Sequence, residues 1–461
     1  MARGRFPGAG RLLGVSGVPE SLAIVGPTVV TMNRERDVID AGTVVIDRGR
    51  FVAIEPDVRD PHTDRRVDGA GCVLLPGLIN CHLHSRPGRA LGDGLSLFEW
   101  HALYPDNLCR HMTEADSRLG GLLAFADSLK CGTTTVLDMT CKPAGAFAAA
   151  EEIGIRARIV PLAADAEFAG DGACDVYSEF IETLAEHPTQ PDARVQYWLG
   201  FDSISGVTEA TLRQIGADAR RLGVGIHGHM SESQEDAGWT RRERSLPAAV
   251  YLERAGILGP RTVLAHCNWL TGHEIALLAR TGTSVAHNPT SNMKLGTGIA
   301  PIPDLLANGV TVGLGTDGML SNFHLDMFEV MRGACLLQRI HRLDAHALMS
   351  WDVLEMATRA GARALGEERE IGSIEIGKRA DAILVDFRDV HLRPLVRGPH
   401  DNLAALLVWC ARGSDVRTVI VDGAVVVEDR RLLPIDEAGL LSEIQRVAGR
   451  LLAAIPESHP R

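Results

Sequence analysis

The sequence lacks the marks of several large classes of protein. Its 461 residues hold no apolar run close to the roughly 18 residues of a membrane-spanning helix, so we expect no membrane partner. None of its nine cysteines forms a CxxC pair, and their odd number disfavours a disulfide framework or a thiolate zinc site. Basic residues are in deficit, with 47 Lys and Arg against 59 Asp and Glu. The net charge of −12 disfavours nucleic acid as a partner.

The amino terminus has no apolar core of the kind that a signal peptide requires. Residues 1–20 are rich in Gly and Arg, and we interpret them as a flexible lead-in. With no disulfide pattern, a reducing cytoplasm is the simplest setting. The composition, 45% hydrophobic and 23% charged, is that of a globular protein. A chain of this length suits a barrel with one accessory domain.

Short apolar strands alternate with helix-like stretches through the middle of the chain. Eight strands, each followed by a helix, favour an α/β fold of the parallel (β/α)8 barrel type over residues 74–368. An open doubly wound sheet is the alternative, but no Gly-rich dinucleotide fingerprint follows the first strand. The predicted strands span 74–84, 133–139, 157–163, 195–202, 225–230, 262–267, 284–288 and 311–316.

A different pattern, of short β-like pieces separated by turns, occupies both flanks of the predicted barrel. It covers residues 21–73 and returns over residues 369–432. We expect the two segments to complete one small β domain, into which the barrel is inserted. Residues 433–461 are predicted to form a helical tail, because apolar residues recur there at helical spacing. These are Leu440, Leu441, Ile444, Val447 and Leu451.

Two histidines end the first predicted barrel strand and point to a metal site. His82 and His84 are two residues apart, so in a strand their side chains lie on one face, about 7 Å apart along the backbone. Neutral imidazole is the commonest protein ligand for zinc and also suits iron. On its own a His-x-His pair is weak evidence, and the other strand ends must supply the remaining ligands.

Groups that bind metals or move protons end four further predicted strands. Active sites of barrel enzymes lie at the carboxyl ends of the strands, so these residues are expected to converge. A set of His82, His84, His229 and Asp317 suits zinc or ferrous iron with room for a water, whose pKa the metal would lower toward about 7. The strand-end residues concerned are His227, His229, Glu232, His266, His287 and Asp317.

Three of these residues have predicted roles in proton transfer. Asp317 can take the proton of the water while also touching the metal, and Glu232 is placed to protonate a leaving group or ring nitrogen. His266 can orient the water or polarise the bond under attack. His287 is a candidate to face the substrate. His227 alternates with His229, so we expect it to face the other side of its strand in a structural role.

Several motifs combine these residues in a pattern that resembles the amidohydrolase superfamily. The resemblance covers roughly residues 21–432 and is closest to the branch of S-adenosylhomocysteine and methylthioadenosine deaminases, guanine deaminase and the triazine hydrolases. The motifs are Pro76-Gly-Leu-Ile-Asn-Cys-His-Leu-His84, His229-Met-Ser-Glu232, His266, His287-Asn-Pro-Thr-Ser-Asn-Met-Lys-Leu-Gly-Thr-Gly, Gly315-Thr-Asp-Gly and Gly372-Ser-Ile-Glu-Ile-Gly-Lys-Arg-Ala-Asp.

The resemblance implies a distorted (β/α)8 barrel with a composite β-sandwich built from both chain ends. It implies one divalent metal, Zn²⁺ or alternatively Fe²⁺, on the four ligands above, with Glu232 and His266 as the proton-handling pair. The fourth predicted strand, 195–202, holds no Lys, which disfavours a two-metal variant bridged by a modified lysine. Relatives of this kind are often dimers or tetramers, and a homo-oligomer is a corresponding expectation.

At two positions expected to bind the substrate, this chain differs from the family pattern. Nucleoside deaminases of this branch usually carry a His after strand four, where this chain has Asp202, and a ribose-binding Glu after strand one. The matching segment, from Trp100 to Asn107, has no clear equivalent of that Glu. These changes disfavour adenosine-type nucleosides, and Asp202, Trp100, Asn107 and His287 become the substrate-binding candidates. Asp202 is expected to contact a cationic or amino group.

The sequence therefore predicts a metal-dependent hydrolase of a small molecule that acts on a carbon–nitrogen bond. The leading version is hydrolytic deamination of an amino-substituted N-heterocycle by metal-bound hydroxide. The alternative is hydrolysis of an exocyclic amide, urea or chloro substituent by the same site. A fold does not decide between these reactions, because residues in the loops set the chemistry.

Overall fold

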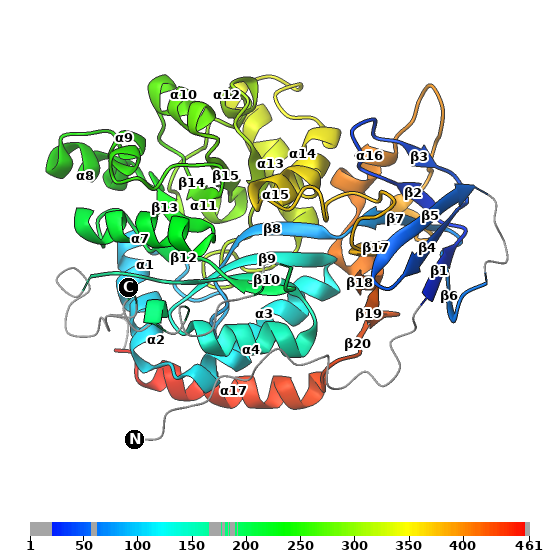
Figure 1. The fold of residues 1–461 in the computed structure, drawn as a ribbon, viewed down its shortest axis with the longest axis horizontal. Coiled ribbons are helices and arrows are strands. Elements are labelled where there is room, and N and C mark those ends of the chain that lie inside the picture. The colour runs from blue at the N-terminus through cyan, green and yellow to red at the C-terminus, as the bar shows by residue number, and fades with distance from the viewer. Residues whose placement is uncertain are drawn as a thin grey trace.

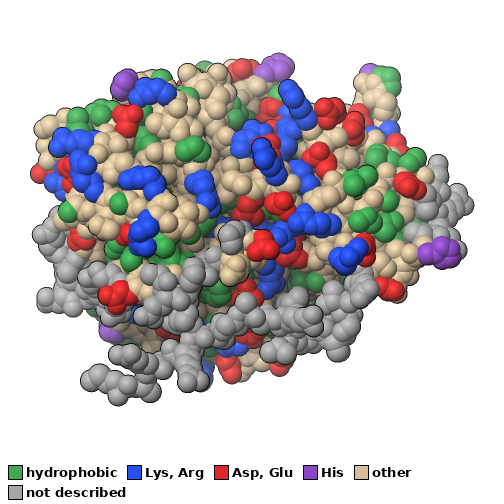
Figure 2. Space-filling model, viewed as in Figure 1, with side chains coloured by type: hydrophobic (Ala, Val, Ile, Leu, Met, Phe, Trp, Pro, Cys, Tyr) green, Lys and Arg blue, Asp and Glu red, His purple; other side chains and the backbone are tan. Residues whose placement is uncertain are grey.

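The computed structural model of the chain is an α/β protein, shown in Figure 1. The structure describes residues 21–56, 62–165, 177, 180–182, 184, 190 and 192–456. The predicted lead-in, residues 1–20, lies outside the described residues. No helix among the described residues is long and apolar enough to cross a membrane. The face drawn in Figure 2 carries basic and acidic side chains interspersed.

Parallel strands form two sheets at the centre of the molecule. One sheet has the order β11-β10-β9-β8 and the other the order β12-β13-β14-β15-β16, and every pairing within them is parallel. The bounds are β8 Leu78–Leu83, β9 Thr133–Thr140, β10 Arg156–Pro161, β11 Val195–Tyr197, β12 Leu199–Phe201, β13 Ile226–Met230, β14 Thr262–His266, β15 Ser284–His287 and β16 Val312–Leu314.

Helices follow most of these strands, as the alternating pattern predicts, and Figure 1 shows them arranged around the two sheets. The helices of the central region are α1 Leu97–Leu103, α2 Pro105–His111, α3 Glu114–Lys130, α4 Pro143–Ile153, α7 Glu209–Leu222, α8 Gln234–Arg244, α9 Ala248–Arg254, α10 Gly272–Thr281, α11 Pro289–Leu295, α12 Ile302–Ala307, α13 Met327–Arg342, α14 Ser350–Met356 and α15 Arg359–Ala364.

Six of the eight predicted strands are present within two residues at each end, and the other two are each divided. The predicted strand 195–202 breaks at the buried Trp198, whose main-chain N–H donates to the carbonyl of Ile159 at 2.9 Å. The residues before the break, in β11, pair with β10, and those after it, in β12, pair with β13. The chain therefore passes from one parallel sheet to the other within this segment.

The prediction of one continuous strand over residues 74–84 was wrong, because the segment is divided at Gly77. A Cβ at Gly77 would lie 2.0 Å from Oγ1 of Thr134, so only glycine permits this close approach. Before the break, β7 (Cys72–Pro76) pairs antiparallel with β17 (Ala382–Asp386). After it, β8 joins the parallel sheet.

Strands from both ends of the chain share a sheet, as the returning pattern predicts. A seven-stranded sheet has the order β20-β19-β18-β17-β7-β2-β3, and a four-stranded sheet the order β5-β4-β1-β6. Figure 1 shows these segments together at one side of the molecule. The remaining bounds are β1 Ser21–Val25, β2 Thr28–Val30, β3 Val38–Ile39, β4 Gly42–Asp47, β5 Arg50–Pro56, β6 Arg65–Asp68, β18 Val416–Val421, β19 Ala424–Glu428 and β20 Arg431–Leu432.

The carboxyl-terminal segment is helical, as predicted. Helix α17, Glu437–Ala453, follows the short helix α16, Leu403–Ala405, and the strands β18 to β20. It lies along the outside of the helical layer in Figure 1. Glu437, its first residue, forms an ion pair with Lys130 of α3, with 2.6 Å between the carboxylate oxygen and the ammonium nitrogen. Four of its apolar residues are buried against the core, whereas Leu441 is 53% exposed.

Candidate metal centre and active site

The predicted ligands come together at the carboxyl ends of the parallel strands. His82 lies in β8 and His84 follows it, while His229 lies in β13 and Asp317 follows β16. The Nε2 atoms of His84 and His229 are 3.2 Å apart. Oδ1 of Asp317 lies 3.5 Å from Nε2 of His82 and 3.6 Å from Nε2 of His84. Four side chains from three strands therefore surround one small volume.

Hydrogen bonds to main-chain carbonyls orient two of the histidine rings. Nδ1 of His84 lies 2.7 Å from the carbonyl oxygen of Met139, and Nδ1 of His229 contacts the carbonyl oxygen of Asp202. A carbonyl oxygen only accepts hydrogen bonds, so each Nδ1 must carry the proton. Each Nε2 therefore presents a lone pair to the common volume, the form that binds a metal.

His82 reaches the same form through a second histidine. Nδ1 of His227 lies 2.8 Å from the carbonyl oxygen of Val263, so His227 carries its proton there and its Nε2 is an acceptor. That Nε2 lies 2.8 Å from Nδ1 of His82, which must be the donor. The prediction that His227 faces away from the site was wrong, because its ring contacts a ligand candidate directly.

Burial keeps the imidazoles of His82 and His84 neutral. It lowers the pKa of His82 to about 4 and holds the pKa of His84 well below its usual range. Burial opposes ionisation of Asp317, but its interactions with the neighbouring imidazoles, first of all His82, outweigh burial, so the Asp317 pKa stays well below its usual range. Nε2 of His82 is buried and has no hydrogen-bond partner among the described residues. Three neutral nitrogens and one carboxylate are a donor set that fits a divalent metal.

The two predicted proton-handling residues lie beside this cluster. Nε2 of His266 is 3.7 Å from Oε2 of Glu232 and 4.0 Å from Oδ2 of Asp317. Burial raises the pKa of Glu232 to about 8, which favours its neutral acid at neutral pH. His266 and Asp317 have φ values of 69° and 62°, strained for residues with a side chain. Such strain at the ends of two strands of one sheet is typical of functional sites.

The comparisons with known proteins agree with this cluster. Residues 73–426 match the amidohydrolase family. The chain belongs to the amidohydrolase family. It is 38% identical over 426 residues to the 5-methylthioadenosine/S-adenosylhomocysteine deaminase of Desulforudis audaxviator, which covers 90% of this chain and 96% of that relative. It is 35% identical over 423 residues to the 5'-deoxyadenosine deaminase of Methanobrevibacter smithii, covering 90% and 94%.

Solved structures of similar fold point the same way. An adenosine deaminase from Xanthomonas campestris with bound zinc has a TM-score of 0.87 at 28% identity, covering 94% of this chain and 98% of that one. A zinc complex of the atrazine chlorohydrolase from Arthrobacter aurescens has a TM-score of 0.83 at 25% identity, covering 94% and 100%. The family implies a fold of the (β/α)8 barrel type. This amidohydrolase is accordingly a metal-dependent hydrolase that acts on carbon–nitrogen bonds.

The predicted substrate-binding residues of the amidohydrolase differ in how their polar groups are used. The main-chain oxygen of Asp202 holds His229, and its carboxylate Oδ1 is 3.9 Å from Nδ1 of the same ring. The indole N–H of Trp100 donates to the carbonyl of Leu91 at 3.1 Å. The side-chain amide of Asn107 donates to two carbonyls of α1, each at 2.9 Å, so its nitrogen caps a helix end.

His287 keeps both ring nitrogens unpaired. It is fully buried, neither nitrogen has a hydrogen-bond partner among the described residues, and burial lowers its pKa to about 3. A neutral imidazole of this kind costs free energy unless a ligand or water completes its hydrogen bonds. His287 therefore remains a candidate to contact the substrate through its ring nitrogens.

Three polar residues of the site were missed in the sequence. Asp138 of β9 accepts hydrogen bonds from Ser85, from N at 2.8 Å and from Oγ at 2.5 Å. Ser291 donates to Oδ2 of Asp317 at 2.6 Å, and Asn292 accepts from Nδ1 of His266 at 2.8 Å. A carboxylate near the end of the apolar stretch 133–139 was the available signal for Asp138. The other two lie on α11, where a polar residue has no distinctive spacing.

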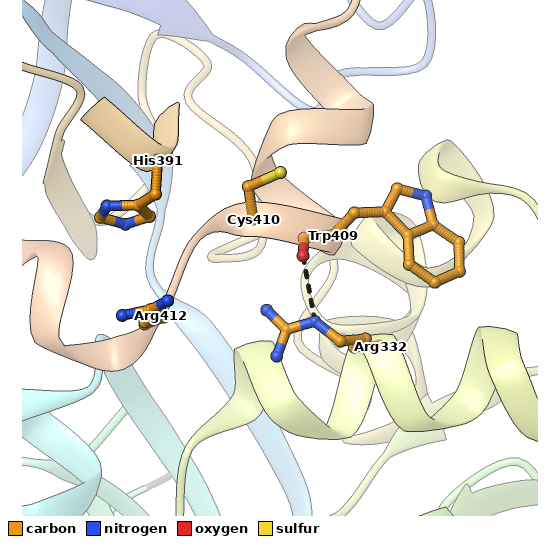
Figure 3. A pocket seen from close by; sticks show the side chains of 5 residues that line it. All are labelled: Arg332, His391, Trp409, Cys410 and Arg412. Atoms are coloured by element: carbon orange, nitrogen blue, oxygen red, sulfur yellow. Dashed lines mark hydrogen bonds between the residues drawn. The ribbon is translucent and has the colours of Figure 1, made fainter. Parts of the chain in front are cut away.

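A separate pocket contains none of these residues. Figure 3 shows Arg332 of α13 directed toward the segment 409–412, with its guanidinium bonded to the carbonyl of Trp409 at 3.2 Å. The same guanidinium donates to the carbonyl of Ala411 at 2.9 Å and contacts Glu329. The donors of Arg332 are thus already engaged. The pocket is lined by Arg332, His391, Trp409, Cys410 and Arg412.

Proposed function

We propose that this amidohydrolase removes an exocyclic amino group from an N-heterocycle by hydrolysis and releases ammonia. The observation that carries the proposal is the arrangement of acid and ligands. The Nε2 lone pairs of His82, His84 and His229 converge with Asp317, and a carboxyl group kept neutral by burial lies beside them. Relatives named as deaminases of adenine compounds support the same reaction.

The proposed ligands of the divalent metal are His82, His84, His229 and Asp317, and the proposed metal is zinc, with ferrous iron as the alternative. When bound, such a metal would lower the pKa of water toward about 7 and so supply a nucleophile at neutral pH. The printed descriptions of zinc-bound neighbours support zinc. The donor set itself suits both metals.

The protein's own groups handle the protons. Asp317 is proposed to accept the proton of the attacking water, and its Oδ2 is held by Ser291 at 2.6 Å. Glu232, which burial keeps protonated at neutral pH, delivers a proton to the ring or leaving nitrogen. His266, fixed through Nδ1 by Asn292, orients the water or polarises the bond under attack. His287, with two unpaired nitrogens, is proposed to contact the substrate.

The relatives and the residues carry different information about the substrate. The names of the relatives favour an adenine ring. Asp202 and the segment from Trp100 to Asn107 depart from the pattern by which nucleoside deaminases bind ribose. The side-chain amide of Asn107 already donates hydrogen bonds to carbonyls of α1. We therefore propose an aminated N-heterocycle whose attached group is not a free ribose. Asp202, Trp100 and Asn107 stay candidates for binding that group.

The finer architecture is proposed on the same grounds. The two parallel sheets would close into a distorted (β/α)8 barrel over residues 74–368. Residues 21–73 and 369–432 would form a composite β-sandwich, and 433–461 a helical tail. We further propose a cytoplasmic homo-oligomer, a dimer or tetramer, that acts on a small molecule and neither nucleic acid nor a membrane.

Ammonia release tests the reaction. Enzyme of known metal content would be incubated with adenosine derivatives, guanine, pterins and aminotriazines, and we expect ammonia from one class. In Glu232→Gln, the turnover of that substrate should fall by about 10²- to 10⁴-fold while the metal content is unchanged. Loss of metal from this variant would instead identify Glu232 as a ligand. The control variant is Glu235→Gln, which changes the next glutamate along the chain, an exposed one.

The second candidate function is the triazine-hydrolase reaction, favoured by the atrazine chlorohydrolase neighbour. Its products are a larger amine, an acid or chloride, and no ammonia. Detection of these products from the same panel, with no ammonia from any member, would replace deamination by hydrolysis of an exocyclic amide, urea or chloro substituent.

A further inference from the structure

A buried arginine next to the metal ligands has no partner in the described structure. Arg86 follows His84 by two residues and is 4% exposed. Its Nε is buried without a hydrogen-bond partner. Among the described residues, none accepts a hydrogen bond from its guanidinium or pairs with it as an ion. A buried, unpaired charge is strongly unfavourable, so such a group is expected to have a ligand.

The loop that carries Arg86 is held in place. N and Oγ of Ser85 donate to the carboxylate of Asp138, and N of Arg86 donates to the carbonyl of His84 at 3.2 Å. The positive charge of Arg86 contributes to the lowered pKa of His84, after burial itself. The main chain of Arg86 is thus held beside the proposed metal ligands, and its guanidinium lies close enough to act on the His84 pKa.

Two of the three acidic groups around Arg86 have other partners. Asp106 binds Nδ1 of His101 at 2.9 Å, and Asp138 is occupied by Ser85. The carboxylate of Asp202 is the third, and its Oδ1 lies 3.9 Å from Nδ1 of His229, beyond hydrogen-bond distance. None of these three carboxylates forms an ion pair with Arg86 in the described structure.

A cysteine pair is the remaining neighbour of Arg86. The free thiol of Cys109 is hydrogen-bonded to that of Cys141, and this hydrogen bond is the main cause that lowers the Cys109 pKa to about 7. The charges of Cys109, Cys141, Asp202 and Asp106 raise the Arg86 pKa against the effect of burial, although none of these groups forms a hydrogen bond with the guanidinium among the described residues. Sulfur is a weak hydrogen-bond acceptor, however, and does not match the planar guanidinium fork.

We propose that Arg86 binds an anionic group of the substrate, a carboxylate, and so selects heterocycles that carry one. The guanidinium fork matches a carboxylate with two parallel hydrogen bonds. Because Arg86 lies only two residues from His84, the anion must be attached to the ring under attack or to a short link from it. The inference rests on the proposed function, whose substrate class it narrows.

A matched pair of ligands tests the inference. Pterin and pterin-6-carboxylate share one ring and differ in the carboxylate alone. Their equilibrium binding would be measured by calorimetry, and their turnover by ammonia release, with wild type and Arg86→Met. We expect Arg86→Met to weaken binding and kcat/KM for the carboxylate by about 100-fold, chiefly in KM, and those for pterin by less than about 3-fold. Arg86→Lys should restore part of the loss.

The control is Arg110→Gln, which removes the same charge from an exposed position on α2. This variant should leave the binding and turnover of both pterins unchanged. Equal affinity of the wild type for the two pterins, or an equal loss with both in Arg86→Met, would overturn the inference. Carboxylate binding that depends on Arg86 without ammonia release would uphold it and overturn the proposed deamination alone.

The melting temperature of the ligand-free proteins separates a binding role from a structural one. Removal of an unpaired buried charge should leave the melting temperature of Arg86→Met equal to or above that of the wild type. A lower melting temperature, reversed when Cys109 is also replaced by Ser, would identify the thiolate as the partner of Arg86 and overturn the inference.

Discussion

Which ring nitrogen carries the proton decides whether each histidine can bind a metal through the other nitrogen. His84 and His229 each donate to a carbonyl from another strand end, and His82 donates to His227. Each of these bonds frees one Nε2 lone pair. A second residue that fixes the tautomer in this way typically affects metal affinity nearly as much as a ligand does. His227 is therefore a positioning residue for the site.

Replacement of His227 tests this role. His227→Leu removes the acceptor for Nδ1 of His82, so the ring of His82 is free to rotate or change tautomer. We expect the metal dissociation constant, measured by chelator competition, to rise by about 10- to 100-fold. His227→Gln keeps an acceptor and should lose less. The exposed His273→Leu is the control, and an unchanged constant in His227→Leu would refute the role.

At the scale of elements, an ion pair joins the helices that cover the strand ends. Nδ1 of His101 in α1 lies 2.9 Å from Oδ1 of Asp106 in α2. Burial opposes protonation of His101, but the bond to Asp106 outweighs it and raises its pKa to about 9. The Asp106 pKa is lowered, in agreement with the same pair.

The pair predicts a pH-dependent contribution to stability. The folded pKa of His101 lies above the ordinary value of 6.5, so its stabilisation is fully present below pH 6.5 and is lost as the pH rises through about 9. His101→Gln should therefore lower the melting temperature more at pH 6 than at pH 10. An equal decrease at both pH values would contradict this, and the exposed His111→Gln is the control.

At the scale of the whole molecule, a buried ion network joins the parallel strands to the carboxyl-terminal sheet. Arg156 of β10 is 1% exposed and binds Asp381 through Nε at 2.8 Å and through a second nitrogen at 3.0 Å. It also contacts Asp422 at 2.5 Å. The charges of these carboxylates overcome burial and raise the Arg156 pKa.

Loss of this arginine should destabilise the fold. Arg156→Met leaves two carboxylates facing each other with one partner fewer, and we expect a cost of about 3–5 kcal/mol in the free energy of unfolding. Denaturant titration would measure it. Arg213→Met, which breaks an exposed pair with Glu209 on one helix, should cost only about 0.3–0.5 kcal/mol. Similar costs for the two variants would disprove the structural role of the network.

Local pattern was enough to predict most strands and the convergence of the ligand candidates. Apolar runs and their polar ends are properties of adjacent residues, and the carboxyl ends of parallel strands meet on one side of a sheet. The division of strand 74–84 was not predictable, because it depends on contact between Gly77 and Thr134, which are distant in sequence. Trp198 divides its strand for a similar reason, since it packs against Gly225.

The sequence by itself determined the family, the alternation of strands and helices, and the residue types gathered at the strand ends. The tertiary structure alone decided which nitrogen of each histidine is free, that His227 faces the site, and that Arg86 is buried with no hydrogen-bond partner in the described part of the chain. Tautomers and unpaired charges depend on hydrogen-bond partners that come from other elements. A sequence pattern contains no information on which of those partners lie within 3 Å of each other.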